Sequence, residues 1–153
     1  MTNPPVDLHW IDLEDFRFRE WVALRQRILR DPLGLVYTEA DLEEERGERH
    51  LILDQAGRLV GGLAVKVLTP ERWKIRQVAV AESEQGRGYG NLLMEHAMQK
   101  AREANVEEIV IHAREVVVPF YEKLGFVCVE EPFEEVGIPH RRMEITFPFE
   151  PAA

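Results

Sequence analysis

The stretch Gln85-Gly86-Arg87-Gly88-Tyr89-Gly90, QGRGYG, lies between an apolar, strand-like run and a helix-like run. The run before it is IRQVAVAE, residues 75–82, and the run after it is NLLMEHAMQKAREA, residues 91–104. A helix that follows a glycine-rich loop presents backbone N–H groups without partners inside the helix, and its dipole favours negative charge at that end. The stretch therefore predicts an anion site at the start of the helix.

Two well-known phosphate loops are excluded by the residues that follow these glycines. A P-loop requires Lys and then Ser or Thr after its last glycine, whereas Gly90 is followed by Asn91 and Leu92. A dinucleotide-binding loop requires a third glycine at position 91 and an acidic residue at the end of the next strand, where the chain has His112 and Ala113. A flexible turn is the remaining alternative, but it does not explain why the glycines stand at a helix start.

The length and composition of the chain set limits on its class. With 153 residues, of which 45% are apolar and 31% charged, we expect one globular domain over residues 1–153. The net charge of −9 argues against nucleic acid as a partner and leaves room for a cationic substrate. No apolar run approaches the roughly 20 residues that span a bilayer, and the first residues lack a signal-peptide pattern, so we expect a cytoplasmic protein without a membrane partner.

Hydrophobic periodicity predicts a mixed sheet flanked by helices. The expected strands are residues 6–13, 50–54, 59–68, 71–82, 107–113, 126–131 and 141–147. The expected helices are residues 15–30, a short one near Thr38, 91–104 and 117–125. This order predicts an α+β fold in which an α/β/α sandwich encloses the sheet.

The strand before the glycines contains a shift in its alternation. Trp73 and Ile75 alternate on one face, but the next apolar pair, Val78 and Val80, is displaced by one residue. A β-bulge produces such a shift, because one extra residue re-aims every later side chain. The bulge would fall at residues 76 and 77. The alternative is that both faces of the strand are buried and the pattern has no such meaning.

Two motifs resemble those of the GNAT acetyltransferase superfamily. The spacing Gln85-x-x-Gly88-x-Gly90 is similar to its acyl-CoA pyrophosphate motif, and VPFYEKLGF, residues 118–126, resembles its C-terminal Tyr-x-x-x-Gly-Phe signature at the expected distance. The order of strands and helices also matches from residue 6 to residue 147. Within the superfamily, VPFYEKLGF followed by GIPHRRME, residues 137–144, looks most similar to the ElaA-like branch.

The resemblance implies a largely antiparallel sheet that is splayed in its middle, and acetyl-CoA as the acetyl donor. Unpaired backbone groups at Val78, Ala79 and Val80 would then bind the thioester arm of the donor. Phe120 would pack either in the core or against the pantetheine, and Lys123 would either reach a phosphate of the coenzyme or be a solvated side chain. The pyrophosphate would be bound by the loop and the first helical turn, namely Gln85, Gly86, Arg87, Gly88, Tyr89, Gly90 and Asn91.

Acetyl transfer to an amine needs a neutral amine, an oriented thioester and protonation of the leaving thiolate. By resemblance, Tyr121 protonates the thiolate. A lysine-like amine costs about 4.6 kcal/mol to deprotonate at pH 7, so some acceptors require a base. His112 ends a strand and titrates in the right range, but a structural role for it, Glu115 or His140 as the base, and a base acting through water all stay open.

The acceptor side is less defined by the sequence. Many members of the superfamily have Asn where this chain has Arg114, and a guanidinium there suggests an acidic group on the acceptor or a contact to the coenzyme. The resemblance implies that a loop between the last two strands folds over the acceptor, so His140 either touches substrate or is a turn residue after Pro139. We also assign Arg76 to the acceptor side.

The function that the resemblance implies is an N-acetyltransferase that moves an acetyl group from acetyl-CoA to a primary amine by direct attack in a ternary complex. The acceptor would be a small-molecule or peptide amine, and a homodimer is possible. The alternative is a noncatalytic acyl-CoA-binding or regulatory module with the same fold. The five histidines show no ligand spacing, so we expect no metal.

Overall fold

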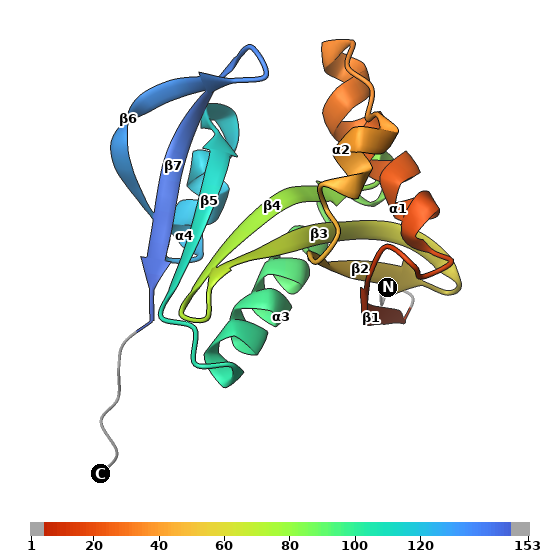
Figure 1. Cartoon of the computed structure of the whole chain (residues 1–153), viewed down its shortest axis with the longest axis horizontal. Coiled ribbons are helices and arrows are strands. Elements are labelled where there is room, and N and C mark those ends of the chain that lie inside the picture. The colour runs from red at the N-terminus through yellow and green to blue at the C-terminus, as the bar shows by residue number, and fades with distance from the viewer. Residues whose placement is uncertain (1–4, 148–153) are drawn as a thin grey trace. The chain divides into compact units, whose positions relative to one another are not determined.

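The computed structural model describes residues 5–147 of the chain (Figure 1). Seven strands form a hydrogen-bonded sheet in the order β1-β2-β3-β4-β5-β7-β6. The chain divides into two compact units: unit 1 comprises Met1–Lys66 and Gln77–Ala97, and unit 2 comprises Val67–Arg76 and Met98–Ala153. The expected mixed, largely antiparallel sheet with flanking helices is confirmed, whereas the single domain over residues 1–153 stays a prediction.

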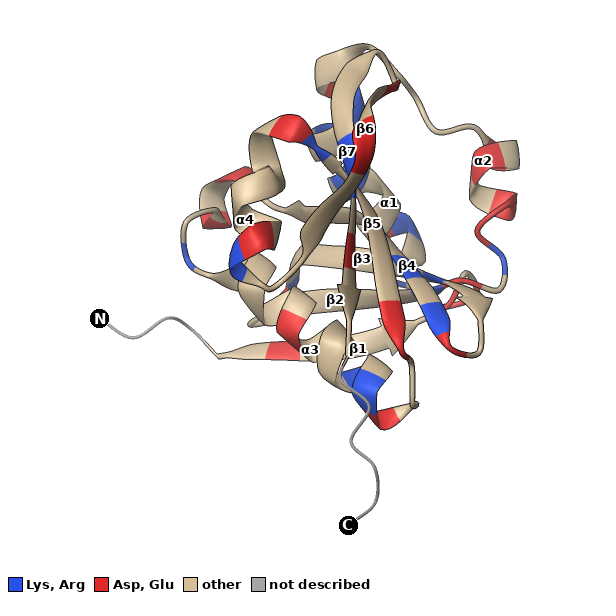
Figure 2. Cartoon of the chain, turned by 90° about the vertical axis from the view of Figure 1, so that its left-hand side faces the viewer, with Lys and Arg blue, Asp and Glu red and all other residues tan. Residues whose placement is uncertain are grey.

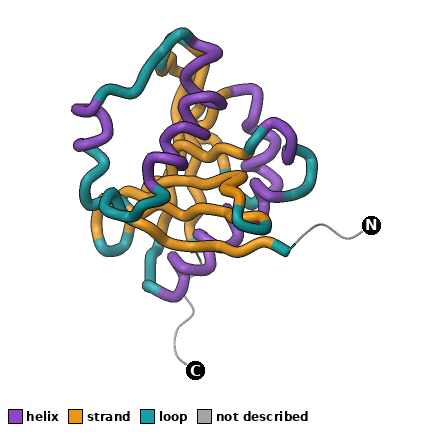
Figure 3. The backbone as a smooth tube through the Cα atoms, turned by 90° about the vertical axis from the view of Figure 1, so that its right-hand side faces the viewer, coloured by secondary structure: helices purple, strands orange, loops and turns teal. Residues whose placement is uncertain are grey.

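In unit 1 the first three strands form an antiparallel meander. They are β1 (Val6–Ile11), β2 (Arg49–Gln55) and β3 (Arg58–Thr69), and β3 continues into unit 2. The turn between β2 and β3 is Ala56-Gly57, in which both residues have positive φ, as the commonest two-residue hairpin turn requires. Figure 3 shows these strands side by side in orange, with β1 at the edge.

Helices cover both faces of β3 in unit 1. A Cβ added at Gly62 would meet the Trp21 ring of α1 (Phe18–Arg25) at 2.8 Å, and a Cβ added at Gly61 would meet Leu93 of α3 (Tyr89–Glu103) at 3.3 Å. Because successive strand residues point to opposite faces, α1 and α3 lie on opposite sides of the strand. These two glycines are therefore needed for close packing of helix on sheet.

The first helical segment of unit 1 differs from its expected bounds. It begins at Phe18 and not at residue 15, because the Asp15 carboxylate accepts the Arg17 N–H at 2.8 Å and forms a turn ahead of the helix. Beyond α1 the chain continues as a π-helical turn, Gln26–Arg30, and a 3-10 turn, Asp31–Leu33. The short helix expected near Thr38 is confirmed as α2 (Glu39–Glu43), which Thr38 and Asp41 cap reciprocally.

In unit 2 the strands pack their apolar face under α4 (Val118–Lys123). The strands are β5 (Glu108–Arg114), β6 (Val127–Glu135), β7 (Ile138–Thr146) and the first part of β4 (Arg72–Val80). Their buried side chains include Ile109, Ile111 and Met143, with Phe126 beside α4. The other face is rich in charge, and Figure 2 shows acidic segments on β6. No helix within residues 5–147 is long and apolar enough to cross a bilayer.

The last two strands are longer than predicted. The predicted connection between these strands is residues 132–140, but β6 and β7 continue through it as a hairpin whose turn is only Val136-Gly137. Both turn residues have positive φ, which a two-residue hairpin turn accommodates. The pairing register shifts between Val129 and Phe133, so residues 130–132 form an irregularity that accommodates Pro132. The sequence did not predict the longer strands because residues 130–132 interrupt the alternation of apolar and polar residues.

Candidate active site

The glycine loop of unit 1 has a backbone conformation that favours glycine at two of its three glycine positions. Gly86 and Gly88 have φ of +85° and +83°, which L side chains rarely adopt. A Cβ added at either residue would meet no atom within 4 Å, so conformation and not lack of space accounts for these glycines. Gly90 differs, because it lies in the first turn of α3. The predicted arrangement of strand, loop and helix is confirmed here.

The loop presents a run of unused hydrogen-bond donors. Within the described part of unit 1, the backbone N–H groups of residues 86–91 donate to no carbonyl or side chain. The helical ladder starts with the Leu92 N–H, which donates to the Gly88 carbonyl at 3.0 Å. Six consecutive donors at the positive end of a helix of 15 residues form a site that suits phosphate groups.

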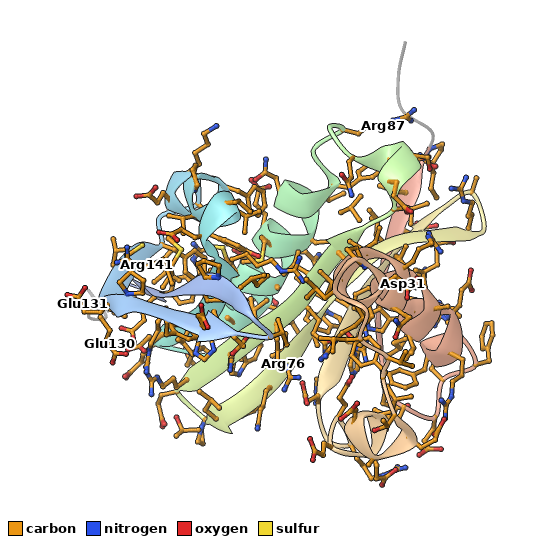
Figure 4. The ribbon with its side chains drawn as sticks, turned by 90° about the horizontal axis from the view of Figure 1, so that it is seen from above. Asp31, Arg76, Arg87, Glu130, Glu131 and Arg141 are labelled. Atoms are coloured by element: carbon orange, nitrogen blue, oxygen red, sulfur yellow. The ribbon has the colours of Figure 1, made fainter. Side chains whose placement is uncertain are left out.

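The side chains of the loop make contacts inside unit 1. The Gln85 amide donates to the Val80 carbonyl at 3.0 Å, and the buried Tyr89 hydroxyl accepts from Gln55 at 2.8 Å. Arg87, labelled on the loop in Figure 4, lies 3.3 Å from the buried carboxylate of Glu84. The loop is thus shaped by its side chains, and its backbone N–H groups are what it offers to a ligand.

The strand before the loop contains the irregularity that its sequence predicts. Gln77 has φ of +58°, an uncommon value for a residue other than glycine. It precedes Val78–Val80, of which Ala79 is buried. The ladder between β4 and β5 comprises only three pairs, from Arg72 with Glu108 to Lys74 with Val110. The predicted binding of a thioester arm at Val78, Ala79 and Val80 stays a prediction.

Tyr121 lies in α4 of unit 2, packed between two aromatic rings. Its side chain is 8% exposed, and its ring meets those of Phe120 and Phe126 edge to face, with centroid distances of 5.0 and 5.9 Å. Burial raises the pKa of the Tyr121 phenol to about 12. Within the described part of unit 2, its hydroxyl has no hydrogen-bond partner. The hydroxyl is therefore protonated throughout the physiological pH range and is free to donate.

The remaining residues proposed near Tyr121 are more exposed. Phe120 is half-buried, and Lys123, at the end of α4, is exposed. Glu115, an alternative base, is exposed in a 3-10 turn (Glu115–Val117) that links β5 to α4. Their roles toward a coenzyme or an acceptor stay predictions.

Three ionisable side chains of unit 2 meet across strand pairs. His112, near the end of β5, has Nδ1 at 3.0 Å from an oxygen of Glu135, the last residue of β6. His140, in β7, has Nε2 at 3.7 Å from the other oxygen of Glu135. Phe133 packs edge to face on His112, with ring centroids 5.0 Å apart. We call His112, Glu135 and His140 the His-Glu-His cluster.

The charges around the His-Glu-His cluster favour an ionised Glu135. Partial burial raises the pKa of this carboxyl, and that is the largest single effect. The hydrogen bond with His112, together with the charges of both histidines and Lys74, outweighs it, so the pKa of Glu135 lies below its ordinary value. Nδ1 of His112 lies 3.0 Å from this carboxylate and 3.4 Å from Lys74 Nζ. Because a carboxylate only accepts hydrogen bonds, the tautomer that satisfies the shorter contact is the one with the proton on Nδ1.

The structure corrects the expected setting of His140. It is not in a loop or in a turn after Pro139: it lies in β7, opposite Arg114 on one side and Phe133 on the other. Its side chain is 5% exposed, and its Nδ1 lies 2.9 Å from the Ile138 carbonyl. The hairpin's two-residue turn leaves no loop to fold over an acceptor, and His140 lies within the sheet; its contact with an acceptor stays a prediction.

The two arginines assigned to the acceptor side lie in unit 2. Arg76 is half-buried on β4 and is labelled in Figure 4, and Arg114 is half-buried at the end of β5. The sequence brought His112, His140, Arg76 and Arg114 forward, but it did not single out Glu135. That residue stood within the acidic stretch EEPFEE, and only the pairing of β6 with β7 places it beside the two histidines.

A second group of ionisable residues lies in unit 1. Ligand atoms of Asp7, His9 and Asp54 come within 4.8 Å of one another across β1 and β2. The sequence predicts no metal, and the spacing of these residues along the chain gives no sign of the group. The hydrogen bond with Asp15 raises the pKa of the Arg17 guanidinium most, and the charge of Asp54 raises it further, so a positive charge already accompanies the group. The absence of a metal stays a prediction.

Comparison with known proteins identifies the family. A family model described as an acetyltransferase (GNAT) domain matches residues 35–147. The chain belongs to the GNAT acetyltransferase family. The uncharacterized N-acetyltransferase YitI of Bacillus subtilis is 24% identical to this GNAT chain over 137 residues, which cover 84% of the chain and 90% of that protein.

Solved structures agree with the GNAT fold. The structure of an acyl-CoA N-acyltransferase from Pseudomonas aeruginosa is similar with a TM-score of 0.77 and 26% identity, covering 92% of this chain and 99% of that one. Escherichia coli ElaA is similar with a TM-score of 0.79 and 22% identity, again covering 92% and 99%. The predicted GNAT membership and the likeness in fold to ElaA are confirmed.

Proposed function

We propose that the protein transfers an acetyl group from acetyl-CoA to a primary amine by direct attack of the amine, without a covalent enzyme intermediate. The observation that carries the proposal is the run of six unused N–H groups, residues 86–91, at the start of α3 in a GNAT chain. Such a run suits the pyrophosphate of a coenzyme. The names of similar proteins, an N-acetyltransferase and an acyl-CoA N-acyltransferase, favour the same donor and acceptor class.

Several residues would hold the donor, which supplies the activated acetyl group. The loop from Gln85 to Asn91 would bind the pyrophosphate through its backbone, with Arg87 as an added charge. Val78–Val80 would bind the thioester arm through backbone groups that lie beyond the end of the ladder between β4 and β5. Phe120 would pack against the arm, and Lys123 would contact a phosphate.

Tyr121 would serve as the acid for the leaving sulfur. A phenol with a pKa of about 12 stays protonated and can donate a hydrogen bond as negative charge develops on sulfur. Proton transfer to a thiolate with an ordinary pKa near 8.5 would be uphill by about 4.8 kcal/mol. Burial, however, raises the pKa of a neighbouring thiol as well as that of the phenol, which brings the two closer.

His112 would accept the proton that the amine loses. The bond between its Nδ1 and Glu135 fixes the ring and leaves Nε2 as the base. As the new C–N bond forms and the C–S bond breaks, the amine proton would pass to His112 and the sulfur would take the proton of Tyr121. Arg76, Arg114 and His140 would contact the acceptor, a small-molecule or peptide amine. Cytoplasmic location and a homodimer stay predictions.

Two measurements test the proposal. In a thermal-shift series, acetyl-CoA should raise the melting temperature of the protein, whereas NAD and ATP should not; stabilisation by either nucleotide alone would contradict it. A thiol-release assay over a library of amines should then show turnover with some acceptor. Binding of acetyl-CoA with no turnover on any amine would favour the alternative, a noncatalytic acyl-CoA-binding module.

A further inference from the structure

The backbone of Gln77 is held in a conformation that its residue type disfavours. Its φ of +58° lies in the left-handed region, where a side chain with a Cβ crowds the following carbonyl. Such a conformation persists only where surrounding contacts determine it. In Asn and Asp, a hydrogen bond between the short side chain and the nearby backbone can stabilise this φ. The Gln77 side chain instead bonds to Tyr37 and Glu45. Its partners therefore explain the conformation.

Both ends of the Gln77 amide are bound inside unit 1. The hydroxyl of Tyr37 donates to Gln77 Oε1, and Gln77 Nε2 donates to Glu45 Oε2 at 3.4 Å. Tyr37 is itself fixed, because its backbone N–H donates to Gln26 Oε1 at 3.0 Å. We call Tyr37, Gln77 and Glu45 the Gln77 clamp. It joins the segment before α2, the segment after α2, and β4.

The clamp is anchored in a buried ion pair. Glu45 is 2% exposed and is paired with Arg25, which is fully buried. The Arg25 guanidinium also lies over the rings of Tyr37 and Trp21, 4.7 and 5.5 Å from their centroids. Two of its nitrogens, Nε and Nη1, have no hydrogen-bond partner among residues 5–147. A buried charge that loses its partner is strongly destabilising, so the pairing with Arg25 holds Glu45 in one place. Glu45 therefore gives the clamp a fixed base.

We propose that Gln77 is a positioning residue for the acyl donor, and that Tyr37 and Glu45 hold it. The inference rests on the proposed function, in which Val78–Val80 bind the thioester arm. Because Gln77 immediately precedes these residues, its φ sets the direction in which their backbone groups point. Releasing the clamp would let Gln77 leave the left-handed region and would turn those groups away from the donor.

The test separates the arm of the donor from its phosphates. Affinities are measured by calorimetry for acetyl-CoA and for adenosine 3′,5′-bisphosphate, which has phosphates but no thioester arm. Tyr37→Phe removes one hydrogen bond and keeps the ring that Arg25 contacts. We expect about a fivefold weaker affinity for acetyl-CoA, since one hydrogen bond is worth roughly this factor, and no change for the bisphosphate.

Two substitutions at position 77 test the role of the backbone. Gln77→Ala removes both hydrogen bonds, and alanine disfavours this φ as glutamine does, so the backbone should leave the left-handed region and we expect about a tenfold weaker affinity for acetyl-CoA. Gln77→Gly also removes the bonds, but glycine adopts this φ without cost, and we expect it to recover part of the affinity. Ile52→Val, a small change in the buried centre of β2, is the control for general destabilisation and should leave both affinities unchanged.

The possible results are distinct. Weakening that is confined to acetyl-CoA, with Gln77→Gly better than Gln77→Ala, supports the inference. Equal weakening for both ligands would overturn it, because the clamp would then only stabilise unit 1. Affinities for acetyl-CoA equal to that of the parent protein would also overturn it and leave the proposed function intact. A parent protein that binds neither ligand would overturn the proposed function itself, and the inference with it.

Discussion

The glycine loop of unit 1 and the His-Glu-His cluster of unit 2 are built in different ways. The loop offers backbone N–H groups, which six consecutive residues present because of two left-handed glycines and a helix start. The cluster offers side chains, which come from three strands and meet only because β5, β7 and β6 pair in a particular register. One is a local property of the chain, and the other is a property of the sheet.

This difference predicts how each region responds to mutation. A side chain in the cluster or in α4 can be replaced without changing the backbone, so its loss should appear in the rate of chemistry. A substitution in the loop alters the direction of several N–H groups at once, so its effect should appear as a weaker affinity for the donor. The following variants test that separation.

The largest effect is expected from Tyr121→Phe. The variant keeps the ring that packs against Phe120 and Phe126 and removes only the hydroxyl, which has no partner within the described part of unit 2. We expect kcat to fall about 1000-fold, within the range for loss of a general acid, with little change in acetyl-CoA affinity or melting temperature. Thiol release and calorimetry measure these quantities. A kcat equal to that of the parent protein would remove Tyr121 from the mechanism.

The next effect is expected from His112→Asn, which removes the proposed base. At pH 7 we expect kcat to fall about 100-fold with a lysine-like amine. The loss should shrink as the pH approaches 10, because the free amine becomes common without a base. His96→Asn, in α3 beside Trp10, is the control and should keep the parent rate. A loss that is constant between pH 7 and pH 10 would show that His112 is structural.

These two residues show how far the sequence alone reaches. Tyr121 and His112 could be proposed from a motif and a strand end, and the loop could be predicted because glycines at a helix start act locally. Glu135 could not be proposed in this way, because His112 is 23 residues away in sequence and His140 lies on the other strand of a hairpin. The sequence did not predict the Gln77 clamp for the same reason, because Gln77 is 40 residues from Tyr37 and 32 residues from Glu45. The irregularity in β4 was visible, but what holds it was not.

Gly88→Ala should change donor affinity and not the chemistry. Alanine at φ of +83° costs roughly 1–2 kcal/mol, so the loop should relax and turn its N–H groups. We expect acetyl-CoA to bind about tenfold more weakly, with kcat at saturating donor close to the parent value. Gly57→Ala, at φ of +85° in the β2–β3 turn, is the matched control. It should lower the melting temperature about as much as Gly88→Ala does, but it should not change the affinity for acetyl-CoA. Equal affinity losses in both variants would contradict the role of the loop.

The smallest effect is expected from Glu135→Gln, measured as stability against pH. The pKa of Glu135 is lowered on folding, so its charge stabilises the protein above the ordinary value of 4.5, and this contribution is lost as the pH falls through the lowered value. Because the side chain is 46% exposed, solvent screens the interaction, and we expect the variant to melt only about 1–2 °C lower at pH 6. The two proteins should melt together below the lowered pKa. Glu134→Gln, the exposed neighbour, should match the parent at every pH. A difference for Glu135→Gln that persists at pH 3 would mean that its charge is not what joins the histidines, and that the cluster, like the loop, depends on shape.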